Sequence, residues 1–223
     1  MQRVSLLLRN LGRGRGVTPE RVVGAMNAAA TQDVREVTLE PVLSRLLHGG
    51  GTHSVLAAKE LALLDAWYRH GSSRLDRTDA SGIGQITDPG AAIMDTAWPL
   101  LANAWASTVL GPRLSNEFAG FVSRFDQPPG GQYTGWHIYL NKDLRTLLGE
   151  RVRGRYAVRY CGGGDLRRCR AQLWGALERA GAALVGKYGP FPSNWRSSAI
   201  PERIKFVPGL LSTTLRYANP TRR

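Results

Sequence analysis

The two cysteines, Cys161 and Cys169, are the residues of this chain whose type and spacing most directly predict chemistry. Seven residues separate them, including three consecutive glycines. A structural zinc site needs four ligands, and the four histidines show neither the pairing nor the spacing that would complete one. We therefore favour a disulfide that closes a short glycine-rich loop, with two free buried thiols as the alternative. If the disulfide forms, we expect an oxidising compartment.

Two histidines stand in contexts that suggest catalysis. His48 precedes three glycines, as in the oxyanion loop of esterases, but that loop works only with a Gly-x-Ser-x-Gly nucleophile elbow, which the sequence lacks. His137 lies between Trp136 and Ile138 and is a candidate general base. The sequence identifies no nucleophile and no orienting carboxylate for it, so a packed, hydrogen-bonded histidine is favoured.

Metal and phosphate motifs are equally weak. Asp76, Asp79 and Asp88 do not alternate as the ligands of a calcium loop do, so a solvated turn is favoured over a calcium site. The glycine-rich basic stretch 12–16 lacks the spacing of a phosphate loop and is interpreted as a turn. We therefore predict no catalytic residue, no metal site and no cofactor in this chain, and assign no substrate-binding residue.

The formal net charge is +13, from 26 Arg and 4 Lys against 17 acidic residues. Such a charge is typical of proteins that bind nucleic acid or an anionic membrane surface. However, the arginines are spread along the chain, and no helix interleaves basic and aromatic residues on one face. An arginine-rich coding bias is the favoured explanation, so we do not expect a nucleic-acid partner.

Membrane segments are not expected either. No apolar run approaches the roughly 18–20 residues that a membrane span requires. The opening residues 1–9 are too short and too soon charged for a secretory signal.

Apolar periodicity and capping residues predict a predominantly helical chain that forms a single segment, 1–223. Helices are expected over residues 19–33, 39–47, 55–70, 89–111, 142–148 and 166–188. Pro99 should kink the fourth of these helices. Residues 112–139 are expected to be loosely structured, with a turn at 128–131, and strands are expected at 153–160 and 203–207. The six tryptophans are interpreted as core or interface anchors rather than a ligand cage.

Several short motifs follow one another in a definite order along the chain. They occupy residues 25–35, 64–67, 74, 93–99, 136, 142–149, 161–169, 195–197 and 202–209. None is specific alone. In this order they resemble the carboxy-terminal part of the β chain of penicillin acylases.

This resemblance implies the αββα fold of the N-terminal-nucleophile hydrolases, of which this chain would be a helix-rich α+β portion. It also implies cleavage of the linear amide of an acylated amine, such as a penicillin or an acyl-homoserine lactone. In that family a serine at the start of the β chain attacks the amide, with its own amino group as base and an Asn and backbone N–H groups at the oxyanion. These residues and the family's calcium ligands map before residue 1.

The chain alone should therefore be inactive. Its implied partners are the remainder of the acylase α and β chains and, for the complete enzyme, a small acyl amide. The protein would be extracellular or periplasmic if the complete precursor is exported, and otherwise cytoplasmic.

The chain also departs from the family. Its end reads Asn219-Pro220-Thr221 where the family usually has Asn-Arg-Pro-Thr, and the loop 76–88 has fewer carboxylates. We expect exposed apolar surface where the absent core would pack. A small basic scaffold for anionic partners and a non-functional gene remnant are the alternatives.

Overall fold

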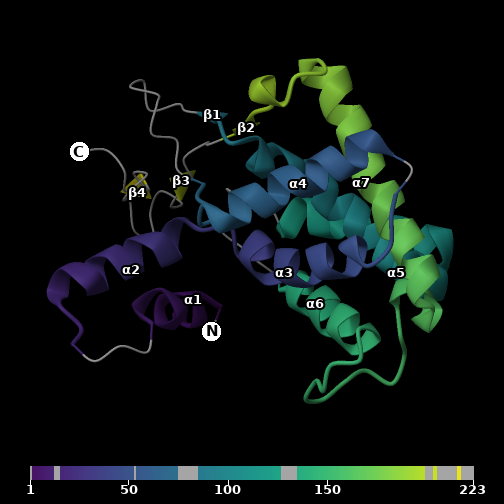
Figure 1. Cartoon of the computed structure of the whole chain (residues 1–223), viewed down its shortest axis with the longest axis horizontal. Helices are drawn as coiled ribbons and strands as arrows, with labels where there is room; N and C mark the ends of the chain where they lie inside the picture. Colours follow the sequence, from purple (N-terminus) through teal and green to yellow (C-terminus); the bar gives the residue numbers. More distant parts are fainter. Residues whose placement is uncertain are drawn as a thin grey trace, which may run out of the picture.

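The computed structural model describes residues 2–12, 16–52, 54–74, 85–126, 135–198, 203–204 and 215–216. It confirms that the chain is predominantly helical. Helices α3 to α7 form the main body, and α1 and α2 lie together at one side of it (Figure 1).

Seven α-helices make up most of the described residues. They are α1 (Gln2–Leu11), α2 (Pro19–Thr31), α3 (Val34–His48), α4 (Val55–Arg69), α5 (Pro89–Phe125), α6 (Trp136–Leu147) and α7 (Leu166–Tyr188), with short 3-10 helices at Cys161–Gly164 and Pro192–Asn194. The strands are two residues long. Gln85–Ile86 (β1) pairs antiparallel with Ser197–Ser198 (β2), and Arg203–Ile204 (β3) with Leu215–Arg216 (β4).

Side-chain caps explain where most of these helices begin. Thr18, Ser54, Asp88 and Asp165 each accept a hydrogen bond from a backbone N–H in the first turn of α2, α4, α5 and α7. Such caps satisfy amides that have no partner inside the helix. The predicted starts of these four helices are therefore confirmed.

The longest helix differs from the prediction. Pro99 lies within continuous helix, and the one interior residue of α5 with non-helical backbone angles is Gly111, at φ 73° and ψ 172°. Glycine adopts this positive φ without strain, and Pro112 then supplies the φ of a new first turn. The helix continues to Phe125, so the prediction of loose structure from residue 112 was wrong for 112–125; the expected turn at 128–131 lies outside the described residues.

Three other predictions were wrong. Helix α3 begins at Val34 rather than at residue 39. Helix α6 begins at Trp136 rather than at residue 142, and Asn141 lies inside it and donates a side-chain hydrogen bond to Thr38 O. Residues 153–160 form no strand. Within this segment Tyr156 stacks on Tyr139 of α6, with 5.8 Å between ring centroids. Helix α1 was not expected, and of the strand expected at 203–207 only β3 lies among the described residues.

The main hydrophobic core lies among α3, α4, α5, α6 and α7. Five of the six tryptophans are buried, and Trp136 packs against the core while partly exposed. This burial agrees with the interpretation of the tryptophans as anchors. A smaller cluster joins α1 and α2 to α3 through Leu6, Ala29 and Val37.

No helix among the described residues combines the length and the apolar character needed to cross a bilayer.

Helices α4 and α7 approach closely at Gly181. A Cβ on this residue would lie 2.7 Å from Cγ of Leu56 and would also collide with the carboxylate of Glu60. Gly186, in the same helix, has no atom within 4 Å of the corresponding position. The two glycines therefore allow a matched test of the packing.

We predict that Gly181→Ala lowers the free energy of unfolding by roughly 1–3 kcal/mol, because the added methyl overpacks the core. Gly186→Ala should instead raise it by about 0.5–1 kcal/mol, since alanine favours the helix. Urea unfolding of both variants measures this difference. Equal effects would contradict the close approach of α4 and α7.

Candidate functional site

Four charged side chains meet in the interior of the protein. Arg35 Nη2 lies 2.7 Å from Asp33 Oδ2 and 2.5 Å from Asp95 Oδ1. Arg74 lies 3.0 Å from the same oxygen of Asp33 and 2.9 Å from Oδ2 of Asp95. Ser197 accepts a hydrogen bond from Arg74 Nη2 at 3.0 Å and donates one to Asp95. We call these five residues the ion network.

Electrostatics keep the ion network charged. Burial alone would raise the pKa of Asp33, but the guanidinium groups of Arg35 and Arg74 outweigh it and hold this pKa far below its usual value. Burial would lower the pKa of Arg74, but Asp95 and Asp33 raise it. Two acids and two arginines leave the cluster neutral, which is the condition under which buried charges are tolerated.

The ion network joins segments that are distant in sequence. Asp33 is also the N-cap of α3, where it accepts hydrogen bonds from the amides of Arg35 and Glu36. Arg74 follows α4, Asp95 lies in α5 and Ser197 lies in β2. Four parts of the fold are therefore fixed relative to one another by these charges.

The ion network is poorly suited to catalysis. The Ser197 hydroxyl accepts a hydrogen bond from Arg74 and donates one to Asp95, and the Asp95 carboxylate contacts both arginines. The serine and its neighbouring carboxylate are thus both held in charged contacts, which is not the arrangement of a nucleophile beside a general base. A hollow of about 350 Å³ opens over Asp95 and Ser197, with Lys187 and Arg196 in its lining.

The predicted disulfide is present. Cys161 and Cys169 are bonded, with their Cα atoms 4.9 Å apart. Gly162 makes the loop possible, because its φ is 61° and a Cβ there would lie 2.6 Å from the amide nitrogen of Cys169. The alternative of two free thiols is therefore not observed.

A buried carboxylate anchors the chain beside the disulfide. Asp143 Oδ2 accepts hydrogen bonds from Trp105 Nε1 at 2.8 Å and from the amides of Tyr160 and Cys161 at 3.1 and 2.9 Å. These contacts tie α6 to α5 and to the end of the loop before α7. No local sequence signal marks this role, because the partners are 17 to 38 residues away.

His137 is fully buried, as favoured for a packed histidine. Its Nδ1 lies 3.7 Å from Oδ2 of Asp126, and its ring meets Trp98 edge-on with 6.4 Å between centroids. Asp126 is the carboxylate that the sequence did not identify. Because neither side chain is exposed, the pair has no access to a substrate in this structure.

Three buried glutamates carry raised pKa values. Burial raises the pKa of Glu60 to about 8, and burial together with a hydrogen bond to Asp65 raises that of Glu40 to about 8. The pKa of Glu36 is raised by burial and by the neighbouring Glu40. These groups are therefore largely protonated near neutral pH and contribute no negative charge to the core.

The remaining sequence candidates have structural roles or lie outside the described residues. His48 Nε2 lies 3.1 Å from Asp65 Oδ2, and the Gly50 carbonyl accepts a hydrogen bond from Trp174. Asp88 caps α5. Asp76, Asp79 and residues 13–15 lie outside the described residues. Within the described ranges, no group of three metal-ligating side chains occurs.

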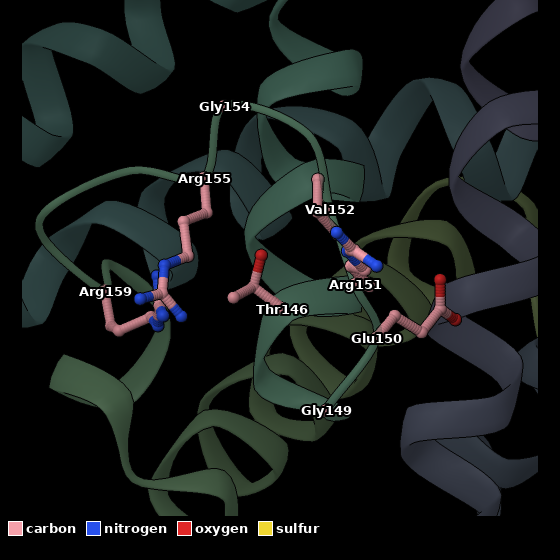
Figure 2. A pocket seen from close by; sticks show the side chains of 8 residues that line it. All are labelled: Thr146, Gly149, Glu150, Arg151, Val152, Gly154, Arg155 and Arg159. Atoms are coloured by element: carbon pink, nitrogen blue, oxygen red, sulfur yellow. The ribbon is translucent and has the colours of Figure 1, made fainter.

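A basic hollow lies at the end of α6. Thr146, Gly149, Glu150, Arg151, Val152, Gly154, Arg155 and Arg159 line a volume of about 540 Å³, which we call the arginine pocket (Figure 2). This pocket was not predicted from the sequence, because the arginines were interpreted as charge spread along the chain.

No protein-family model matches this sequence, and no curated protein matches it.

Replacing Arg74 by methionine should lower the free energy of unfolding by roughly 3–5 kcal/mol, because Asp33 and Asp95 lose a buried partner. Chemical denaturation measures this loss. Arg113→Met is the control: Arg113 pairs with Glu117 at 3.4 Å on the surface, where both side chains are more than half exposed. A loss no larger than that of the control would show that the ion network does not stabilise the fold.

The raised pKa of Glu60 predicts a pH dependence of stability. In the unfolded chain this group titrates near 4.5, and in the folded protein at about 8. Its contribution is therefore fully present below about pH 4.5 and is lost as the pH rises through about 8. As the pH rises, the Glu60→Gln variant should therefore lose less free energy of unfolding than the wild type, by on the order of 2–4 kcal/mol.

Melting temperatures at pH 5 and pH 9 test this expectation. The wild type should lose more stability than Glu60→Gln between the two values, and the exposed Glu178→Gln should behave as the wild type. Parallel curves for the wild type and Glu60→Gln would contradict the burial of a protonated carboxyl.

Proposed function

We propose that this chain is the carboxy-terminal part of the β chain of a penicillin acylase-type amidohydrolase. The complete enzyme would cleave the linear amide of an acylated amine of the penicillin or acyl-homoserine lactone class. This part is inactive alone and acts as a scaffold that supports the substrate pocket or the interface between the α and β chains.

The supporting observation is that the motifs carrying the resemblance meet in the ion network. Asp33 and Arg35 come from segment 25–35, Asp95 from 93–99 and Ser197 from 195–197, and Arg74 is a motif residue by itself. Residues that are scattered in sequence thus form one contiguous set. This set fits a scaffold role, because its five members join four different parts of the fold.

A scaffold role also fits the chemistry of the described side chains. Ser197 is held by charged neighbours, His137 is buried, and Cys161 is bonded to Cys169. None of these is an accessible nucleophile. We therefore propose that the nucleophile is the serine that the resemblance places before residue 1.

Helices α1 and α2 offer a surface for the remainder of the enzyme. Val4, Leu8, Val23 and Met26 are each more than half exposed, with exposed fractions of 59, 63, 65 and 55 %. Large apolar side chains exposed on two neighbouring helices are what a surface covered by another chain would present. We assign this face to contacts with the missing acylase core.

The disulfide supports the proposal that the complete precursor is exported. Disulfides such as that between Cys161 and Cys169 persist mainly in oxidising compartments. An extracellular or periplasmic enzyme is the corresponding expectation.

Activity measurements test the proposal. The purified chain should not hydrolyse a chromogenic phenylacetyl amide or an acyl-homoserine lactone, whereas the complete reading frame that contains it should. Deleting residues 1–223 from that frame should abolish soluble, active enzyme. Turnover by the chain alone would contradict the placement of the nucleophile, and full activity after the deletion would contradict the scaffold role.

A further inference from the structure

The arginine pocket lies where α6 ends and the loop 149–160 begins. In Figure 2 the side chains of Arg155 and Arg159 extend toward one another on one side of the hollow, and Arg151 and Val152 lie opposite them. Thr146 stands between, from the last turns of α6. The hollow is therefore bordered by guanidinium groups from more than one direction.

The pocket carries a net positive charge. Glu150 is the one acidic residue in its lining, and its carboxylate forms ion pairs with Arg145 and Arg45 outside the lining. Hydrogen bonds from Arg145 and Arg45 lower the pKa of Glu150, so its carboxylate stays ionised and paired with these two arginines. In Figure 2, Glu150 lies on the far side of the hollow from Arg155 and Arg159. The three arginines of the lining are thus left without a neutralising carboxylate from Glu150.

The arginines retain donors for a ligand. Arg159 uses one Nη1 donor for the Tyr156 carbonyl at 3.0 Å, which leaves its other N–H groups available. Within the part of the chain that the structure describes, Arg151 and Arg155 form no ion pair. A guanidinium group presents its donors in a planar fork that matches two oxygens of a phosphate.

The frame of the pocket is held in place before any ligand arrives. The loop begins at Gly149, whose φ is 79°, and turns again at Gly154, whose φ is 59°. Tyr156 stacks on Tyr139 and receives Lys142 Nζ at 4.5 Å from its ring centroid. Asp143 fixes the end of the loop through the amides of Tyr160 and Cys161.

The carboxyl end of α6 does not oppose an anion here. Three of the four carbonyls in its last turn, at Leu144, Arg145 and Thr146, already accept hydrogen bonds from the amides of residues 148–150. Their partial negative charge is therefore offset, and the arginines set the local potential.

We propose that the arginine pocket binds a small phosphorylated molecule, either inorganic phosphate or a phosphate monoester. A volume of about 540 Å³ accommodates such a group with a modest organic substituent. A dianion between Arg155 and Arg159 offsets the repulsion of these two cations and makes charge-assisted hydrogen bonds with both. This inference is independent of the amidohydrolase proposal.

Calorimetric titration with inorganic phosphate and with phenyl phosphate, at constant ionic strength, tests the site. Arg155→Ala combined with Arg159→Ala should weaken binding by about tenfold or more, since the ligand loses the charge-assisted hydrogen bonds of both guanidinium groups. Arg153→Ala is the matched control, because Arg153 lies in the same exposed loop but does not line the pocket. It should leave the affinity unchanged.

These measurements distinguish a specific phosphate-binding site from general attraction to a positively charged surface. All of these arginines are at least partly exposed, so the variants should keep the wild-type circular dichroism spectrum. Absence of phosphate binding, or equal weakening by Arg153→Ala, would overturn the proposal. Tighter binding of a single-stranded oligonucleotide, weakened equally by all three substitutions and steeply by salt, would also overturn it in favour of a nucleic-acid surface.

Discussion

The buried pairing of Asp33 and Asp95 with Arg35 and Arg74 is the constraint on which the rest of this structure depends. Each arginine contacts both carboxylates, so no member is satisfied by a single partner. A charge left alone in this environment would cost several kcal/mol, whereas the closed set is neutral. The start of α3, the segment after α4, the middle of α5 and strand β2 must therefore come together in one arrangement.

The same requirement shapes the rest of the interior. Burial raises the pKa values of Glu40 and Glu60 to about 8, so these two groups stay largely protonated near neutral pH, while the buried Asp143 accepts three hydrogen bonds. Part of the arginine content is also structural: Arg35 lies in the core, and Arg170 donates to the Leu46 carbonyl at 2.7 Å. The net charge of the chain is thus not only a surface property.

Local signals in the sequence predicted the features that depend on local contacts. Thr18, Ser54 and Asp88 mark helix starts because a cap needs only the amides of the next turn, and the short spacing of Cys161 and Cys169 predicted their bond. The helix was predicted to end at Gly111, although a glycine followed by a proline also permits a helix to restart. The ion network and the role of Asp126 beside His137 were not predictable in this way, because their members meet only after the helices pack. The lining of the arginine pocket lies within residues 146–159, but its hollow depends on the turns of an irregular loop, for which the sequence has no periodic pattern.

Under the proposed assignment, the ion network belongs to a scaffold and the reacting groups lie in the remainder of the enzyme. The most direct test is to translate the DNA that precedes the codon for residue 1, in the same frame. We predict an uninterrupted frame that contains a serine suited to begin a β chain some hundreds of residues earlier. A stop codon or an unrelated sequence there would contradict the assignment to an amidohydrolase.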